Sequence, residues 1–188
     1  MEKIFFNDIN KSSDKIFQIT TPGIHVFYFK NKNGNLKFEI KESSAIVYIF
    51  GIYDLKNDEV INLETIQLHS APSSKSHLLI KGVLADNASL KYTGKIQVPK
   101  GASQVNASLE NKNLLISDKA KVTTSPVLEI IPHNVKCSHS ATISPINADY
   151  IDYLAMRGID GDTSKKLLIR GFLDEINIKL KDFKQKTT

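Results

Sequence analysis

Short bursts of alternating apolar and polar residues dominate the chain from Thr20 to about Ala141. The bursts are rich in β-branched and aromatic side chains, and no stretch with helical spacing interrupts them. They comprise residues 25–29, 36–40, 45–53, 66–69, 78–84, 90–92, 95–98, 105–109, 114–116, 122–124, 127–131 and 135–139. Each burst predicts a β-strand, and the turns that separate the strands are short and similar.

A weak internal repeat distinguishes between two all-β architectures. Sliding the sequence on itself by roughly 18 residues lays IQVPKGA over LLISDKA, so that Ile96 meets Leu114 and Val98 meets Ile116. In a β-solenoid each coil stacks its inward residues on the preceding coil, which requires approximate repeats of apolar and small residues. We therefore predict a β-solenoid, with a β-sandwich as the alternative.

After Pro145 the apolar period changes from two to 3.6, which predicts two helices. Asn147 can cap a first helix that runs from about Ala148 to Arg157 and stops at Gly158. Asp160 can cap a second helix. Its apolar stripe consists of Leu167, Leu168, Phe172, Ile176 and Leu180, and a polar tail, KDFKQKTT, follows. The helical pair either caps the open end of the all-β body or docks a partner.

These patterns predict an all-β core with C-terminal helices, organised in three parts. Residues 1–19 form an N-terminal segment in which the part before Ile16 shows no clear element. Residues 20–144 form the β-solenoid, and residues 145–188 form a small helical region that caps it and ends in the polar tail.

Composition limits the compartment in which the chain works. Of the 188 residues, only Cys137 is a cysteine, so the chain cannot form an intramolecular disulfide and a reducing compartment is favoured. The longest apolar stretch, residues 45–53, contains Gly51 and is far shorter than the roughly 20 residues that cross a bilayer. We expect a protein of the cytoplasm or an organelle matrix that does not enter a membrane.

Charge argues against nucleic acid as a partner. The net charge is +5, but only Arg157 and Arg170 among the 25 basic residues are arginine, and there is no tryptophan. Arginine forks and aromatic platforms carry most phosphate and base recognition, so nucleic-acid binding is disfavoured.

The motifs of common enzyme classes are missing as well. The chain has no glycine-rich phosphate loop and no GxSxG, HExxH or paired CxxC motif, so an autonomous enzyme is disfavoured.

Five sequence blocks, in order and compatibly spaced, resemble one known family. The blocks are HSAPSSKSHLLIKGVLADNA (69–88), NKNLLISDKAKVTTSPVLEI (111–130), VKCSHSATIS (135–144), YLAMRGI (153–159) and LLIRGF (167–172). They resemble the SufB/SufD family of iron-sulfur cluster assembly proteins over more than half of the chain. The resemblance implies a right-handed parallel β-helix core with helical ends.

Two positions make the resemblance closest to the SufD branch. SufB-like chains carry a cysteine before the LLI strand, in a block like SECDSLLI, where this chain has ENKNLL at 110–115. SufD-like chains carry KCSHGAT, which is similar to KCSHSAT at 136–142. The histidine of that block is implicated in cluster assembly at the junction with SufB, which implies that role for His139. The chain is less than half the usual SufD length, which implies a short or divergent member or an excised fragment of a longer one.

The resemblance implies a non-catalytic scaffold subunit that works in a complex. Family members pair through their cores, so the partner implied is a SufB-like subunit. The pair binds a SufC-like ABC-type ATPase through the C-terminal helical region. The first interpretation of Arg157, Gly158, Gly171 and Phe172 is a helix stop and close helix packing, and the second is that they are candidate residues of the ATPase interface.

Strand alternation places Cys137 and His139 on the same side of one strand. An imidazole nitrogen and a thiolate can help to hold iron or zinc at a subunit junction, with His139 as the metal ligand and Cys137 as its neighbour in cofactor binding. Two ligands cannot complete a four-coordinate site, so the isolated chain should bind no cofactor tightly. The expected cargo is transient iron or a nascent cluster shared with the partner. Alternatively, Cys137 is a small core residue and His139 a hydrogen-bonded core histidine.

Three other residues allow two interpretations each. His69 and His77 flank APSSKS, and they either reach the surface that carries His139 or lie exposed in a turn between coils. Glu110 stands where SufB-like chains offer acid and thiol groups, and it is either a ligand or a solvated loop carboxylate.

Two other functions share the predicted architecture. A carbohydrate-acting β-helix enzyme would use a carboxylate cluster on one face. The acidic residues Asp86, Glu110, Asp118 and Glu129 form no evident pair aligned by the repeat. A structural homodimer that pairs through the β-helix edge, without cluster activity, is the third possibility.

Overall fold

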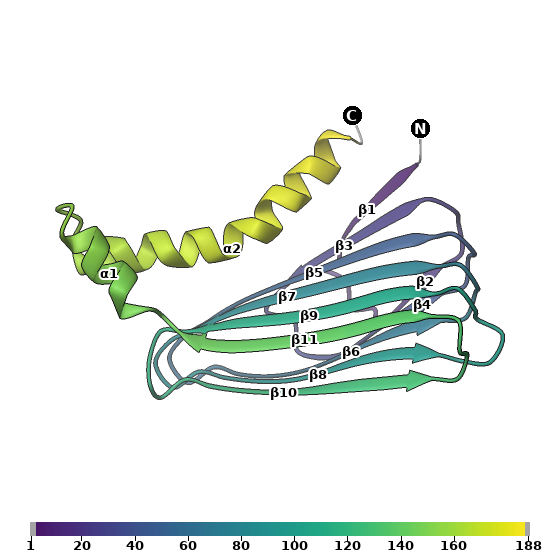
Figure 1. Ribbon diagram of the computed structural model, residues 1–188, viewed down its shortest axis with the longest axis horizontal. Coiled ribbons are helices and arrows are strands. Elements are labelled where there is room, and N and C mark those ends of the chain that lie inside the picture. The colour runs from purple at the N-terminus through teal and green to yellow at the C-terminus, as the bar shows by residue number, and fades with distance from the viewer. Residues whose placement is uncertain (1–2, 187–188) are drawn as a thin grey trace.

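The structure, a computed structural model, describes residues 3–186 and contains eleven strands followed by two helices (Figure 1). The strands are β1 (Ile4–Asp8), β2 (Ile16–Ile19), β3 (Ile24–Lys30), β4 (Gly34–Ile40), β5 (Ile46–Leu55), β6 (Val60–His69), β7 (Lys75–Leu84), β8 (Ser89–Val98), β9 (Asn106–Leu115), β10 (Lys121–Ile130) and β11 (Lys136–Pro145). The helices are α1 (Ala148–Ala155) and α2 (Gly161–Gln185). None of the helices in residues 3–186 is long and apolar enough to cross a bilayer.

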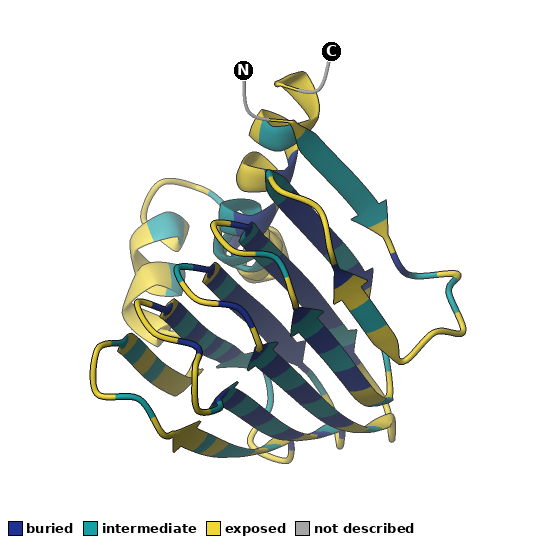
Figure 2. Cartoon of the chain, turned by 90° about the vertical axis from the view of Figure 1, so that its right-hand side faces the viewer, coloured by how far each residue is buried: buried dark blue, intermediate teal, exposed yellow. Residues whose placement is uncertain are grey.

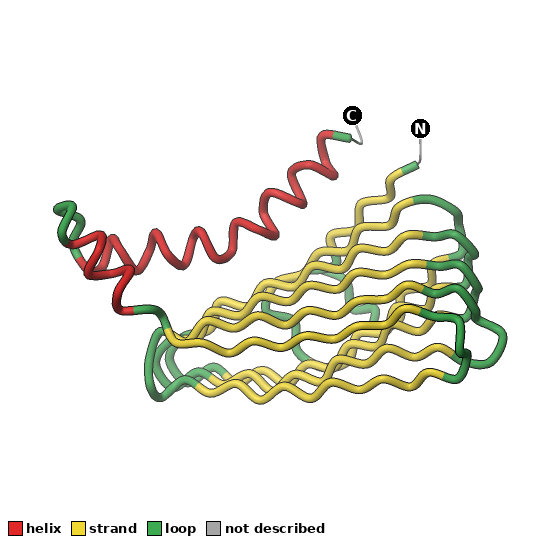
Figure 3. The backbone as a smooth tube through the Cα atoms, in the orientation of Figure 1, coloured by secondary structure: helices red, strands yellow, loops and turns green. Residues whose placement is uncertain are grey.

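Successive strands alternate between two parallel sheets, which confirms the β-solenoid and excludes the sandwich. The odd-numbered strands form a six-stranded sheet in the order β1-β3-β5-β7-β9-β11. The even-numbered strands form a five-stranded sheet in the order β10-β8-β6-β4-β2. Each strand therefore pairs with the strand two places later, and the chain winds through both sheets in every coil (Figure 3).

Each coil spans more residues than the predicted repeat. In the six-stranded sheet, Ile46 pairs with Lys75, Lys75 with Asn106, and Asn106 with Lys136, so about 30 residues separate equivalent positions. The shift of roughly 18 residues was wrong as a coil repeat, because it laid β8 on β9, which belong to opposite sheets. The matched residues also face different ways, because Ile96 points into the core whereas Leu114 lies on the outward side of β9.

Several strands are longer than the apolar bursts predicted. β8, β9 and β10 each join two predicted strands into one of ten residues. In β9 the break in the apolar pattern comes from Asn111 and Asn113, which are buried inside the solenoid, where the Asn113 amide donates to the Asn111 side-chain oxygen at 2.8 Å. Polar residues at inward positions thus hid the continuity of this strand.

The N-terminal segment also contains strands. β1 pairs with β3 from Ile4 opposite Ile24, in a region for which the sequence predicted no clear element. Its residues do not alternate because both of its faces are covered. Phe6 packs in the cluster beneath α2, whereas the ring of Phe5 stacks on His25 with the centroids 4.6 Å apart.

The turns repeat one conformation from coil to coil. Asn31, Asn57 and Asp86 follow β3, β5 and β7, and their φ angles are 48°, 54° and 55°. Asparagine and aspartate tolerate this left-handed region because their short side chains can hydrogen-bond the local backbone. The Asp86 carboxylate accepts a hydrogen bond from the Asn57 backbone N–H at 2.9 Å, which links turns of neighbouring coils.

The main hydrophobic core fills the space between the two sheets, and inward residues make buried stripes along the strands (Figure 2). The stacked coils leave little spare room. A Cβ at Gly51 would lie 2.7 Å from the Phe29 ring, so this position must be glycine while Phe29 stays in place. The buried hydroxyls of Tyr92 and Thr65 hydrogen-bond at 2.7 Å, which satisfies both groups.

The helices begin at the predicted caps. The side chains of Asn147 and Asp160 accept hydrogen bonds from backbone N–H groups at the starts of α1 and α2. Helix α2 extends to Gln185, so the predicted polar tail is largely helical. Phe183 continues the stripe of Ile176 and Leu180, and its ring lies 4.8 Å from that of Tyr48.

Helix α2 lies against the outer face of the six-stranded sheet (Figure 1). Its residues Ile176 and Leu180 are buried there in a second hydrophobic cluster. The strand residues of this cluster are Val26, Phe50, Ile52 and Leu79. Strands β3, β5 and β7 are therefore apolar on both faces, as buried parallel strands usually are.

His69 is fully buried inside the solenoid, and its ring nitrogens lie 2.8 Å from the hydroxyl oxygens of Ser74 and Ser76. The prediction that it is an exposed turn residue was therefore wrong. Burial lowers the pKa of His69 to about 4. The imidazole is neutral in the folded protein at neutral pH.

We expect mild acid to destabilise the fold through His69. Because its pKa is lower in the folded than in the unfolded chain, the unfolded chain binds the proton more readily between these values. The free energy of unfolding should therefore fall by about 2 kcal/mol between pH 7 and pH 5 from this residue alone. Urea denaturation at the two pH values measures it. The free energy of unfolding of His69→Gln should fall correspondingly less over the same pH range. Equal falls in both proteins would contradict the assignment of the acid effect to His69.

Candidate functional site

The candidate residues predicted from the sequence lie in two separate regions. Cys137 and His139 belong to β11, the last strand of the six-stranded sheet. Arg157 and Gly158 lie between α1 and α2, and Phe172 lies on α2. The structure therefore separates the candidate metal residues from the candidate ATPase interface.

β10 and β11 form an open end of the solenoid. Among the described strands, each has a neighbour on one side only, so its other edge carries unpaired backbone groups. The register places Leu128 beside Ile96, yet Leu128 is 46% exposed while Ile96 is buried. Ile130 and Ile143 are exposed as well. Inward positions that are covered in earlier coils are thus open to a partner here (Figure 2).

His139 points into the solenoid at this end. It pairs in register with the fully buried Leu109. Both ring nitrogens of His139 are buried, and neither has a hydrogen-bond partner among the described residues. Burial lowers the pKa of His139, which favours the neutral imidazole that binds metals. Because an unpaired buried polar group costs about 1–3 kcal/mol, these nitrogens need an explanation beyond packing.

Cys137 lies on the same side of β11 as His139, which confirms the predicted alternation. It is half-buried and packs against the main core, as the core interpretation of this residue predicts. Burial raises the pKa of the Cys137 thiol, although a backbone hydrogen bond from Ala107 opposes this effect. The thiol is therefore protonated at neutral pH, and His139 is the better ligand in the free chain.

Cys137 and His139 have no third ligand beside them in the described part of the chain. Within residues 3–186, no group of three or more His, Cys, Asp or Glu side chains is placed to hold a metal ion. The donor set of one imidazole and one thiol fits a site completed by other molecules, since four ligands are usual for iron and zinc in such sites.

Other candidates lie away from His139. Glu110 pairs in register with Ser140 and points to the outer face, where it contacts Lys112 at 2.8 Å. Glu110 therefore lies in a strand rather than in the predicted loop, on the side of the sheet opposite to His139. His77, in β7, also lies on the outer face of the six-stranded sheet, whereas His69, in β6 of the other sheet, points into the core. The two histidines therefore do not reach a common surface.

The helical hairpin carries an exposed apolar surface. Tyr150, Tyr153 and Met156 are exposed, and Met156 reaches 80%. The guanidinium of Arg157 lies 4.6 Å from the centroid of the Tyr153 ring, a cation–π contact. Gly158 has a φ of 81°, which confirms its role as the helix stop.

Gly171 does not serve close helix packing. A Cβ at this position would meet no described atom within 4 Å, so the predicted packing role was wrong. The neighbouring Phe172 is partly buried, and the Lys81 ammonium lies 4.4 Å from its ring centroid. Phe172 thus belongs in part to the contact between α2 and the sheet.

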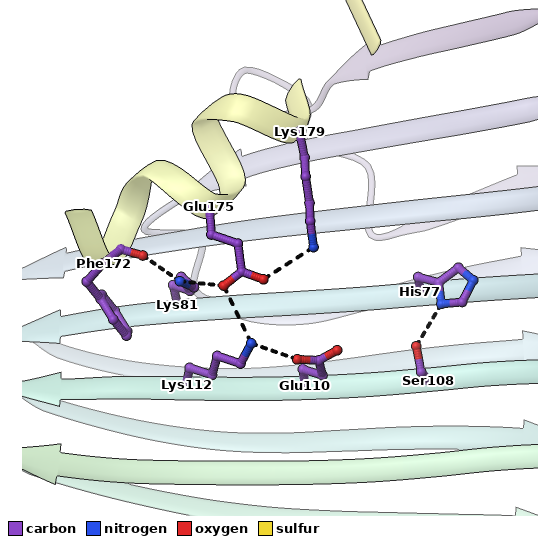
Figure 4. Close-up of polar contacts among 8 residues, drawn as sticks. All are labelled: His77, Lys81, Ser108, Glu110, Lys112, Phe172, Glu175 and Lys179. Carbon is purple, nitrogen blue, oxygen red and sulfur yellow. Dashed lines mark hydrogen bonds and ion pairs between the residues drawn. The ribbon is translucent and has the colours of Figure 1, made fainter. Parts of the chain in front are cut away.

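A polar network fastens α2 to the sheet (Figure 4). The nearly buried Lys81 contacts the Glu175 carboxylate at 2.7 Å and donates to the Phe172 carbonyl oxygen. Lys112 and Lys179 also contact Glu175, at 3.5 and 3.3 Å. Burial would raise the pKa of Glu175, but the hydrogen bond and charge of Lys81, with the other lysines, lower it to about 2.

Sequence reasoning did not identify Lys81 or Glu175. The available signal was the segment LLIKGVL, in which a single lysine occupies an otherwise apolar stretch. A strand that is apolar on both faces must be covered on both faces, and a lysine within it then needs an anionic partner. That partner could not be located without the path of α2.

Comparison with known proteins gives one family. Residues 27–172 match the family described as SUF system FeS cluster assembly, SufBD core domain. An iron-sulfur cluster assembly SufBD family protein of Synechocystis is 34% identical over 142 residues, which is 76% of this chain and 31% of that protein.

Two relatives are named as the iron-sulfur cluster assembly protein SufD. The Escherichia coli protein is 34% identical over 125 residues, covering 66% of this chain and 30% of its own. The Bacillus subtilis protein is 31% identical over 141 residues, covering 71% and 32%. The chain thus spans about three tenths of the length of the curated relatives it matches.

We expect Lys81→Met to loosen α2. The substitution keeps the apolar stem but removes the ammonium that contacts Glu175 and Phe172, so the free energy of unfolding should fall by about 2 kcal/mol. Denaturant unfolding measures the loss, and hydrogen exchange of the α2 amides locates it. Lys179→Ala, which removes an exposed contact to the same carboxylate, should change stability by less than about 0.5 kcal/mol. Equal stabilities of Lys81→Met and the unmodified protein would refute the role of the network.

Proposed function

Because the chain belongs to the SufB/SufD family of iron-sulfur cluster assembly proteins, we propose that it is a SufD-like, non-catalytic scaffold subunit. It pairs with a SufB-like subunit and binds a SufC-like ABC-type ATPase. The observation that carries the proposal is His139, whose two buried nitrogens have no partner among the described residues, at an open solenoid end.

The open end suits a protein partner of similar architecture. The free edges of β10 and β11 offer rows of backbone donors and acceptors to further strands. The exposed Leu128, Ile130 and Ile143 add apolar area that association would cover. A SufB-like core placed here would bring its own side chains to His139.

Iron or a nascent cluster is the cargo of this junction. The neutral His139 imidazole offers a nitrogen lone pair without first losing a proton. Cys137 is close along the strand and would join as a thiolate only once a bound cation lowered its pKa. The partner supplies the remaining ligands, so the isolated chain holds no cluster of its own.

The helical hairpin is the proposed ATPase interface. Its exposed Tyr150, Tyr153 and Met156 surround the turn at Arg157 and Gly158, which the sequence had singled out. Aromatic residues, methionine and arginine are enriched at protein interfaces, in keeping with this composition. Phe172 contributes on the side where α2 meets the sheet.

The carbohydrate-acting enzyme is disfavoured and the homodimer is not. Glu110 lies on the outer face of one sheet, Glu129 contacts Lys95 on the other sheet, and Asp86 lies in a turn. These three residues therefore do not form the carboxylate pair that a carbohydrate-acting enzyme uses. A homodimer remains a second candidate, since the exposed Leu128 and the free strand edges could also pair with a second copy. The lone cysteine favours work in the cytoplasm or an organelle matrix.

His139→Ala tests the cluster role. In a complex reconstituted with the SufB-like subunit and the ATPase, cluster formation on supply of iron and sulfide should fall strongly, because an imidazole ligand is lost. Cluster formation by His139→Asn should fall equally, since this variant keeps a polar side chain but removes metal ligation. Cluster absorbance is the measurement, and thermal melting of each isolated chain shows that the solenoid stays folded.

Cys137→Ser is the matched control on the same strand. If Cys137 only packs, its loss should lower stability by about 1 kcal/mol without a specific cluster defect. Full cluster assembly by a well-folded His139→Ala complex would refute the site. Failure of the tagged protein to capture either partner from its own cells, together with a stable dimer in size-exclusion chromatography, would favour the homodimer instead.

Met156→Glu tests the ATPase interface. Because Met156 is 80% exposed, the substitution should leave the melting temperature unchanged while a buried charge weakens ATPase binding at least about tenfold. Phe172→Ala separates packing from binding, since it should lower the melting temperature through its contact with Lys81. Unchanged ATPase affinity of Met156→Glu, measured by calorimetry, would exclude the hairpin as the interface.

A further inference from the structure

A groove between α2 and the six-stranded sheet has no part in the proposed cluster assembly. It lies between the C-terminal half of α2 and the outer face of β5, β7 and β9, and its volume is about 410 Å³. This volume falls within the range of small-molecule sites, roughly 300–1,000 Å³. His139 and the open end of the solenoid do not line it.

The wall of the groove is aromatic. The Tyr48 ring lies 5.3 Å from the His77 ring at an interplanar angle of 24°, which is a stacked arrangement. Phe183 lies 4.8 Å from Tyr48 on the side of the helix, and Phe50 lies beside them. Such a wall favours a flat ring that can stack against it.

Polar groups are arranged around one free imidazole nitrogen. Ser108 lies 2.8 Å from Nδ1 of His77 and so sets the orientation of the ring. Nε2 points away from Ser108 and has no partner among the described residues (Figure 4). This nitrogen is thus available to a ligand in the groove.

The charge at His77 is positive on balance. Lys179 of α2 and Lys186, which directly follows this helix, line the groove together with the acids Asp182 and Glu110. Glu110, on β9, contacts Lys112, while Lys179 contacts Glu175 at 3.3 Å. Burial lowers the pKa of His77, and the charges of Lys179 and Lys75 lower it further against the opposing effect of Glu110. A positive potential of this kind attracts anions.

We propose that this groove binds a planar aromatic ligand that carries an acidic group. The ring stacks on Tyr48 and Phe183, while Lys179, Lys186 and Nε2 of His77 bind the anion. The acid is a phosphate or a carboxylate, because both accept hydrogen bonds from lysine and imidazole. Nucleotides and aromatic carboxylates are the two sources of this chemistry.

Calorimetric titration of the chain with four probes tests the proposal. Adenosine monophosphate and 2-naphthoate supply the ring with a phosphate or a carboxylate, adenosine supplies a ring without charge, and inorganic phosphate supplies charge without a ring. At least one aromatic anion should bind with a Kd below about 1 mM, and it should bind at least about tenfold more tightly than adenosine or phosphate. Which of the two anions binds identifies the source.

Variants then locate the binding. His77→Ala and Lys179→Gln should each weaken binding about tenfold, whereas Lys91→Gln, an exposed lysine on the other sheet, should have no effect. If His77→Ala has a lower melting temperature than the unmodified chain, Ser108→Ala is tested in its place. That substitution keeps the His77 imidazole and only frees it to rotate. Binding of neither anion, equal binding of phosphate alone, or binding that both groove variants leave unchanged would overturn the proposal.

Discussion

Every coil of this protein depends on parallel pairing with the coil before and after it. A strand hydrogen-bonds the strand two places later, and the inward side chains of consecutive coils form the core together. A single coil could neither satisfy its backbone groups nor bury its apolar residues. The same requirement cannot be met at the last coil, where β10 and β11 have no further neighbour among the described strands.

The candidate cluster site follows from that unmet requirement. His139 occupies an inward position that is filled in earlier coils by apolar residues such as Leu109 and Leu78. There its nitrogens are withdrawn from water but receive no hydrogen bond from the described residues. The position therefore combines low solvation with unused donor and acceptor capacity, which is a state that a shared metal or a partner's side chain would relieve.

Local signals in the sequence predicted local structure well, and distant contacts account for the failures. Asn147 and Asp160 cap the helices as expected, because capping depends on a few neighbouring residues. That Cys137 and His139 share one side of the strand followed from alternation alone. By contrast, Asn111 looked like part of a loop because its position inside the solenoid is decided by the neighbouring coils. The partner of Lys81 was equally hidden, since Glu175 approaches from a helix more than ninety residues later.

Helix α2 changes how this solenoid should come apart. In a simple stack of coils, each coil contacts only its neighbours, so the ends can fray one coil at a time. Here one continuous helix contacts β1, β5 and β7 and is held to the last of these by Lys81 and Glu175. Separating the first strand from its neighbour therefore disturbs the same helix that covers the middle of the sheet. The N-terminal half of the solenoid and the C-terminal helix are thus joined into one cooperative unit, in which the earliest and latest parts of the chain unfold together.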